Sequence, residues 1–321
     1  MDTTTPKFFQ SIPPYWLAVG ITAIISWLLT LWCVYADGQY GIALFILLPI
    51  FIGAAPVLIY NRLEKITWGR AKSVAFASLG IYTLGLLVFA LEGLICIFMA
   101  APFGALLTWI SAAIAHSFTE RKPEGSTNLL LLLAFAVPLM SFGEKYLGEP
   151  ALTSVVTSVE IDASPETVWQ NVVEFPQLPE PQELIFKTGI AFPINAKIEG
   201  AGVGAVRYCN FSTGSFVEPI TVWDEPNLLA FNVEECPAPM RELSFWDVDA
   251  PHLHDYFVSQ RGQFKLTRLP GNRTLLEGTT WYTHNIRPAW YWRWWSDAII
   301  HAIHNRVLSH IKTVSEKPIS Q

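Results

Sequence analysis

Arg207, Glu218 and His304 are the side chains with which this chain could most readily do chemistry. Residues 205–211 and 215–223 alternate as strands do, and the apolar members of both segments share a face with Arg207 and Glu218. An isolated buried charge is costly, so these two side chains should form an ion pair or meet a polar ligand. The sequence is compatible with two roles for this pair: a purely structural ion pair, or a pair that orients a ligand.

His304 is predicted to face the same sheet from the last helix of the chain. Ile300, His304, Val307 and Ile311 recur at helical spacing, and the histidine is the polar member of this stripe. A core histidine that is hydrogen-bonded to a neighbour fits this position. So does a ligand contact or a general base.

Turn chemistry predicts which residues share the concave face of the sheet. A two-residue loop at 213–214 would pair Cys209 with Glu218 and Phe211 with Phe216, leaving Arg207 and Glu218 as diagonal neighbours. With a second turn at 224–227, one face is predicted to hold Arg207, Cys209, Phe211, Phe216, Glu218, Ile220, Leu229, Phe231 and Val233. Among these, Arg207, Phe211, Phe216, Glu218 and Phe231 are candidate ligand contacts.

The last hairpin adds a second group of candidates. An even loop at 271–272 would place Leu266 opposite Glu277, and Glu277, Thr279 and Trp281 would then line the cavity. An odd loop would turn all three outward.

No metal site and no cofactor are expected. His301 and His304 form an i, i+3 pair on a predicted helix, and His252, His254 and His284 lie elsewhere without a recognisable zinc spacing. The sequence also lacks a nucleophile motif, a phosphate-binding loop and a cofactor fingerprint.

Residues 236–257 are predicted to form a lid over the cavity mouth. Loops of this length in a compact domain are usually functional or disordered, and the apolar content of this segment argues against disorder. Glu242, Trp246 and His254 are the candidate contacts at the rim. A static flap over the sheet edge is the alternative.

The composition predicts a membrane domain joined to a globular one. Of the 321 residues, 51% are hydrophobic and only 15% are charged, whereas about a quarter are charged in a typical soluble chain. The net charge of -6 argues against nucleic acid as the main partner, because phosphate binding needs a basic surface.

Residues 1–148 are predicted to form a multi-pass α-helical membrane domain. The predicted spans are 14–35, 41–60, 74–91, 94–115 and 128–146. The last span is short, so four spans remain the alternative if it lies flat.

Lys and Arg in the short loops predict the orientation. The 61–73 loop carries four of them, the 116–127 loop carries two and the N-terminal segment carries Lys7, whereas the turns at 36–40 and 92–93 carry none. This bias puts the N-terminus in the cytoplasm. Five spans then put the C-terminal domain on the outer, periplasmic side of the cytoplasmic membrane.

Residues 153–317 are predicted to form a separate α+β domain. Period-two alternation predicts a strand at 153–161, and Ser164 followed by Pro165 predicts the start of a helix that runs to about residue 175. The later strands are predicted at 194–199, 205–211, 215–223, 228–235, 258–269 and 273–284, and a long helix at 288–315.

The run VTSVEIDASPETVWQNVVEF at 156–175, followed by these strands and the long helix, resembles the START-like superfamily. This superfamily is also called SRPBCC, or polyketide cyclase/dehydrase-like. The resemblance extends over nearly all of 153–317 and none of the membrane domain. It implies a helix-grip fold, in which a curved antiparallel sheet wraps around the C-terminal helix with a hydrophobic cavity between them.

The resemblance also implies a hydrophobic or lipid-like ligand and no shared cofactor. The resulting prediction is a membrane-anchored protein that binds a hydrophobic or amphipathic small molecule. A cyclase- or hydrolase-type enzyme that uses Glu218 or Glu277 with His304 is one alternative. A ligand-responsive membrane sensor or scaffold is the other.

Overall fold

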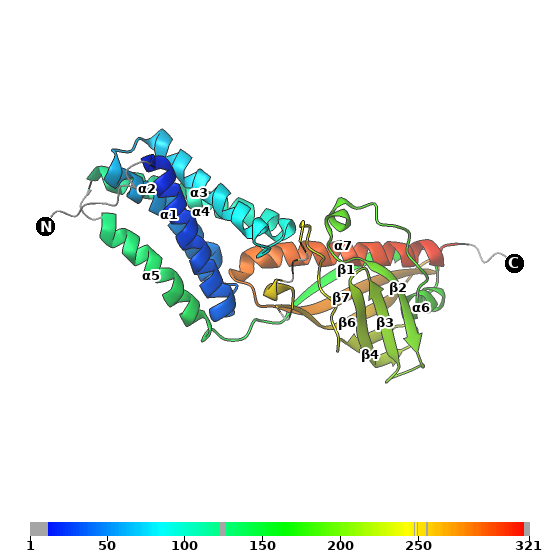
Figure 1. Cartoon of the computed structure of the whole chain (residues 1–321). Helices are drawn as coiled ribbons and strands as arrows, with labels where there is room; N and C mark the ends of the chain where they lie inside the picture. Colours follow the sequence, from blue (N-terminus) through cyan, green and yellow to red (C-terminus); the bar gives the residue numbers. More distant parts are fainter. Residues whose placement is uncertain (1–11, 122–125, 247, 249, 255, 318–321) are drawn as a thin grey trace. The chain divides into compact units, whose positions relative to one another are not determined.

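The computed structural model describes residues 12–317 except 122–125, 247, 249 and 255 (Figure 1). The chain divides into two compact units. Unit 1 comprises Met1–Gly148, Ser244–Pro251 and Ile286–Pro288, and unit 2 comprises Glu149–Leu243, His252–Asn285 and Ala289–Gln321.

Unit 1 consists mainly of long apolar helices. They are α1 (Pro14–Leu31) with the π-helix η2 (Trp32–Ala36), the π-helix η3 (Ala43–Leu47) with α2 (Leu48–Leu63), α3 (Trp68–Val88), α4 (Leu94–Arg121) and α5 (Ser126–Glu144). Among the described residues, five helical segments are long and apolar enough to cross a membrane.

Two of these helices differ in extent from the prediction. α3 begins at Trp68, six residues before the predicted start, because the Thr67 side chain accepts a hydrogen bond from the Arg70 backbone N–H and caps the helix. α4 continues past residue 115 to Arg121. Arg70 and Arg121 therefore lie on helix ends rather than in loops.

Close packing within unit 1 depends on small residues. A Cβ atom on Gly53 of α2 would lie 2.3 Å from the Thr108 carbonyl oxygen of α4, so only glycine permits this approach. Thr108 in turn donates to the Pro49 carbonyl oxygen at 3.3 Å.

Unit 2 is built on one antiparallel sheet with strand order β1-β7-β6-β5-β4-β3-β2, seven strands in the described part of the chain. The strands are β1 (Thr153–Ile161), β2 (Pro193–Glu199), β3 (Val206–Phe211), β4 (Gly214–Asp224), β5 (Leu228–Asn232), β6 (Phe257–Leu269) and β7 (Arg273–His284). The helices are α6 (Pro165–Val173), the 3-10 turns η5 (Leu184–Thr188) and η6 (Pro251–Leu253), and the long α7 (Ala289–Ser315).

The sheet curves around α7. The helix contacts β1 and β2, which are the first and last strands in the sheet order, and it also contacts β7 and α6. A flat sheet of this width could not bring both end strands to one helix, so the sheet must wrap around it. Figure 1 shows α7 lying beside the sheet of unit 2.

The core of unit 2 lies between the sheet and its helices. Leu229, Leu276, Leu308 and Ile311 are essentially inaccessible, and Trp169 of α6 packs in the same cluster. As predicted, α6 begins at Pro165, with the Ser164 hydroxyl accepting from the Thr167 N–H at 3.4 Å. This cap fixes the point at which β1 gives way to the helix.

The β3–β4 hairpin corrects one predicted register. Its loop is Ser212–Thr213, so Arg207 pairs with Glu218 and Cys209 pairs with Phe216. The predicted pairing of Cys209 with Glu218 is wrong by two residues. A shift of two preserves the alternation of faces, so the predicted concave set stays on one side of the sheet.

The β6–β7 hairpin corrects a second register by one residue. Leu269 pairs with Arg273 across a three-residue loop, and Leu266 pairs with Leu276 rather than with Glu277. Gly271 and Asn272 have φ values of +81° and +60°, the left-handed geometry that such loops require. A slip of one residue reverses every face assignment on the strand.

Candidate functional site

A cavity of about 120 Å³ lies between the sheet and α7, entirely within unit 2. Its walls come from β3 to β7 on one side and from α7 on the other. They are Arg207, Cys209, Phe211, Phe216, Glu218, Phe231, Val233, Phe257, Ser259, Arg261, Gly262, Gln263, Phe264, Gly278, Thr279, Thr280, Ile300, Ile303, His304, Val307 and Leu308. Most of these side chains are apolar, so the few polar ones determine how a ligand would be oriented.

Arg207 and Glu218 form a buried ion pair on the cavity wall. They are directly opposite each other on β3 and β4, rather than diagonal as predicted, and are 1% and 6% exposed. Arg207 Nη1 donates to Glu218 Oε2, and Arg207 Nε donates to the Val173 carbonyl oxygen at 3.1 Å. The end of α6 therefore helps to hold the guanidinium group in place.

Aromatic rings surround the Arg207 guanidinium group. The centroids of Phe175, Phe231 and Phe264 lie 5.6, 5.6 and 5.5 Å from Cζ. These contacts stabilise a cation through the electron-rich ring faces. The rings do not accept hydrogen bonds from the N–H groups in the guanidinium plane, so these groups need other acceptors.

One of those groups has no partner. Arg207 Nη2 is buried and makes no hydrogen bond with any residue that the structure describes. Arg207 lines the cavity, so a molecule inside it would lie next to this guanidinium group.

Burial changes the protonation of the neighbouring groups. It raises the pKa of Glu218, and the adjacent Arg207 guanidinium opposes that rise. Burial also raises the pKa of the Cys209 thiol to about 12, with the Glu218 carboxylate adding to the effect. Cys209 is therefore a protonated thiol at neutral pH and not a thiolate nucleophile.

His304 joins α7 to the opposite end of the sheet. Its Nδ1 lies 3.0 Å from the Thr157 hydroxyl of β1, and its Nε2 lies 2.8 Å from the Thr280 hydroxyl of β7. The Thr157 hydroxyl also lies 2.8 Å from His301 Nδ1. A hydrogen-bonded chain thus runs from exposed His301 through Thr157 and His304 to Thr280 at the cavity.

His304 is neutral in this setting. Burial lowers its pKa to about 4, and the nearby His301 adds to the decrease. A neutral imidazole has one donor and one acceptor nitrogen, so either tautomer satisfies both threonine hydroxyls. The histidine is therefore a fully bonded part of the cavity wall that can also exchange a proton.

Glu277 and Trp281 do not line this cavity; Thr279 borders it, although its side chain shares their face of β7. The three-residue loop before β7 turns both side chains to the opposite face of the sheet. There the Glu277 carboxylate lies 3.9 Å from Lys265 Nζ, and the Trp281 ring lies 4.6 Å from Arg261 Cζ.

The predicted lid residues are not among the residues that line the cavity. Glu242 is buried, whereas Trp246 and His254 are exposed, and none of the three lines the cavity. The start of the segment is held by other parts of unit 2: Ala191 N–H donates to the Pro239 carbonyl, and Arg241 N–H donates to the Gly189 carbonyl at 2.8 Å. Residues 247, 249 and 255 lie outside the described residues.

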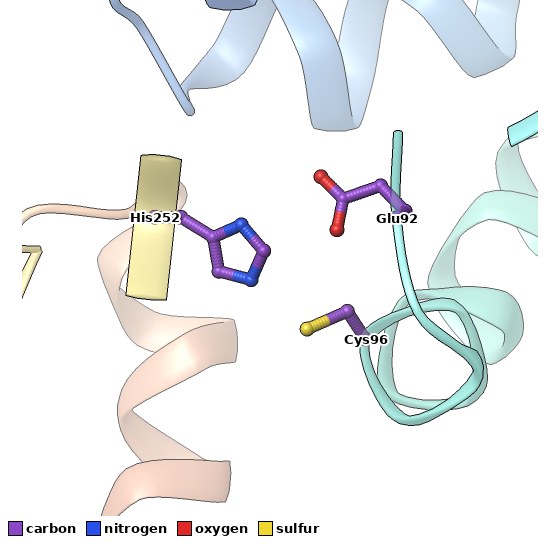
Figure 2. Close-up of side chains that lie close together, drawn as sticks. All are labelled: Glu92, Cys96 and His252. Carbon is purple, nitrogen blue, oxygen red and sulfur yellow. The ribbon is translucent and has the colours of Figure 1, made fainter. Parts of the chain in front are cut away.

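Possible metal ligands are sparse within each unit. Figure 2 shows Glu92, which precedes α4, and Cys96, one turn later on that helix, both in unit 1. The figure also shows His252 of η6, which belongs to unit 2. Neither unit alone groups three His, Cys, Asp or Glu ligand atoms among its described residues.

Sequence reasoning missed the two threonines of the His304 network. Thr157 lies on β1 and Thr280 on β7, and the register Val155↔Thr280 places both on strands that border α7. The alternation of β1 could have shown that Thr157 points to the same side as Val155 and Val159. Whether the Thr157 hydroxyl meets His304 depends on how α7 is rotated about its own axis. No turn residue in the sequence specifies that rotation.

Comparison with known proteins finds similarity at the level of structure. No family model and no curated protein matches the chain. Solved structures that are similar include protein XoxI from Bacillus cereus, at 17% identity and a TM-score of 0.34, covering 50% of this chain and 94% of that one. Truncated norcoclaurine synthase from Thalictrum flavum has 12% identity and a TM-score of 0.35, with 54% and 98% covered. The Aha1 dimer from Colwellia psychrerythraea has 14% identity and a TM-score of 0.30, with 51% and 99% covered.

Unit 2 has a helix-grip-like fold. The strand order and the contacts of α7 with both end strands carry this assignment.

Proposed function

We propose that unit 2 binds a small, mostly apolar molecule that carries a polar group, and that unit 1 anchors it in a membrane. The observation that carries the proposal is the cavity itself, in which apolar walls surround a buried ion pair and His304. Ligand sites typically combine such walls with a few placed polar groups.

The size of the cavity favours a compact ligand. At about 120 Å³ it is close to an engineered apolar cavity of about 150 Å³ that binds benzene. Sites for drug-sized molecules are larger, at roughly 300–1,000 Å³. A single ring or the end of an acyl chain matches this volume, and a whole membrane lipid does not.

The surface of unit 1 supports membrane insertion. Phe98, Phe135 and Leu139 are 69%, 70% and 73% exposed on helices that carry almost no charge. Apolar side chains that face outward over long helices are what a lipid environment requires. At the start of α7, Trp290 and Trp294 are also exposed, as is common at a membrane–water interface.

A cavity-filling variant tests ligand binding. Val307→Phe places a larger side chain in the cavity wall, whereas Val222→Phe makes the same change at an exposed position on β4. The full chain is purified in lipid nanodiscs, and native mass spectrometry identifies the small molecules it retains. We expect a compound bound to the wild type and to Val222→Phe and absent from Val307→Phe. Equal retention by both variants would contradict a site in this cavity.

Reporter fusions test the orientation. Five apolar helices and the bias of Lys and Arg support our proposal that the C-terminal domain lies on the outer side of the cytoplasmic membrane. A phosphatase that is active only outside the cytoplasm should be active when fused to the C-terminus and inactive when fused after Lys65. An active cytoplasmic reporter at the C-terminus would overturn this topology.

The His304 network favours a second candidate, an acid–base enzyme. The chain from His301 through Thr157 to His304 offers a route for a proton between the surface and the cavity. Incubating the full chain with the retained compound, or with a simple ester, should then yield a product that His304→Gln does not form. An unchanged compound would leave binding as the function.

A further inference from the structure

The buried ion pair leaves one guanidinium donor unused inside the cavity. A guanidinium group has five N–H donors in one plane. Arg207 uses Nε on the Val173 carbonyl and Nη1 on Glu218, while Nη2 has no partner among the described residues. A buried donor on a charged group that stays unbonded is costly, so a native site usually supplies an acceptor.

On the protein side of the cavity, the Cys209 thiol also interacts with the guanidinium group, but a sulfur atom is a weak acceptor. Phe231 and Phe264 present ring faces to the guanidinium group, and these contacts do not satisfy N–H groups in its plane. A single water molecule is the competing occupant, but a buried water needs two to four polar partners, and the surroundings are largely aromatic. A ligand oxygen aimed at Nη2 meets the requirement with one atom.

The charge balance of the Arg207–Glu218 pair determines whether a charged or a neutral ligand oxygen can bind next to it. Arg207 is already neutralised by Glu218, and the pair is nearly inaccessible to solvent. The other arginine at the cavity, Arg261, is exposed and stacked on Trp281. A carboxylate ligand would bring an extra negative charge next to Glu218 with no unpaired buried cation to meet it, and its desolvation would be uncompensated.

From these contacts we infer that the cavity selects a neutral, compact apolar molecule whose carbonyl oxygen accepts a hydrogen bond from Arg207 Nη2. The inference rests on the proposed function and names the ligand class. Carbonyl oxygen suits the site because it accepts in plane and carries no proton that would need a further acceptor. The ion pair then orients the ligand, and the apolar walls hold its body.

Three probes of similar size test the inference: ethylbenzene, acetophenone and benzoate. Their dissociation constants are measured by ligand-observed NMR on the full chain in nanodiscs, with empty nanodiscs subtracted. Acetophenone should bind at least about tenfold more tightly than ethylbenzene, the gain expected for one hydrogen bond to a charged group. Benzoate should bind more weakly than acetophenone. The carbonyl stretching band of bound acetophenone should also move to lower frequency in the wild type.

A double variant separates the donor from the cavity. In Arg207→Met/Glu218→Leu, the preference for acetophenone over ethylbenzene should disappear while ethylbenzene still binds. The matched control is Lys265→Met/Glu277→Leu, which removes an ion pair from the other face of the same sheet and should keep the preference. The infrared shift of the wild type gives an answer even if the double variant does not fold.

The possible results distinguish a failure of this inference from a failure of the proposed function. Equal binding of ethylbenzene and acetophenone, tightest binding of benzoate, or an unshifted carbonyl band would each overturn the inference while the cavity remained a binding site. Failure of all three probes to bind would instead count against the proposed function.

Discussion

The Arg207–Glu218 pair should behave as a single unit in folding. Arg207→Met leaves the Glu218 carboxylate without its cation and the Val173 carbonyl without its donor. Glu218→Leu leaves the guanidinium charge buried at 1% exposure. Each single variant should therefore lower the free energy of unfolding of unit 2 by roughly 3–5 kcal/mol, the cost of breaking a buried pair from one side.

The double variant Arg207→Met/Glu218→Leu should cost much less than the sum of the two. It removes both charges together, and methionine and leucine can pack against Phe231 and Phe264. We expect a coupling energy of at least about 3 kcal/mol in the double-mutant cycle. Additive effects would show that the two side chains do not interact.

The pH dependence of the two single variants should differ. Burial raises the pKa of Glu218 above its ordinary value of 4.5, and Arg207→Met removes the cation that opposes this rise. A carboxyl group whose pKa is higher in the folded state than in the unfolded state binds a proton on folding. The free energy of unfolding that Arg207→Met loses relative to the wild type should therefore become smaller as pH falls toward 4.5, by up to about 1.4 kcal/mol per pH unit. Glu218→Leu has no carboxyl group at this position and should show no such recovery.

Pulse proteolysis of the full chain in nanodiscs, over a urea series at several pH values, measures these differences. Lys265→Met/Glu277→Leu is the control, because this pair lies 3.9 Å apart with the lysine side chain 57% exposed. An exposed pair contributes about 0–1 kcal/mol, so the control should remain near the wild type. A deficit of Arg207→Met that stays constant with pH would refute the assignment of an unpaired buried carboxyl group.

Two further predictions concern His304 and Gly262. Because burial lowers the pKa of His304 from 6.5 to about 4, unit 2 should lose roughly 3 kcal/mol of stability as pH falls from 6.5 to 4. His304→Gln should remove that part of the acid sensitivity in pulse proteolysis while leaving the part due to His252, and an unchanged pH slope would contradict it. Gly262→Ala would place a Cβ 2.6 Å from the Phe231 ring, so it should destabilise unit 2 by about 1–3 kcal/mol and push the ring into the cavity. Gly278→Ala, where the nearest atom is 3.6 Å away, is its control; equal melting temperatures for the two variants would show that the ring moves freely.

Local signals in the sequence were sufficient for the elements of unit 2. The alternation of 153–161 matches β1, and the Ser164–Pro165 pair marks the start of α6 as predicted. Both depend on neighbouring residues alone, through side-chain period and backbone capping. The start of α3 was missed because the Thr67 cap lies before a charged stretch, which the hydropathy pattern assigns to a loop.

The registers of the hairpins could be predicted only where the length and position of the connecting loop could be predicted. The error of two residues at Ser212–Thr213 left Arg207, Glu218 and Phe231 on the cavity side, because side-chain direction repeats every two residues. The error of one residue after Leu269 moved Glu277 and Trp281 to the opposite face. The sequence Pro-Gly-Asn is compatible with both loop lengths, so propensity alone could not decide between them.

The third residue of the β6–β7 loop also determines which charged side chains face the cavity. With an even loop, Glu277 would have joined Glu218 inside, and two carboxylates near one arginine would have favoured a shared proton and acid–base work. The three-residue loop instead pairs Glu277 with Lys265 outside and leaves Arg207 and Glu218 as a balanced pair within. With Ser259, Thr279, Gln263 and the exposed Arg261 also at its wall, the cavity offers two polar features close to the buried pair and α7: one guanidinium donor and the neutral His304–Thr280 contact. Both are suited to orienting an uncharged molecule, which is why the geometry supports ligand binding more strongly than hydrolysis.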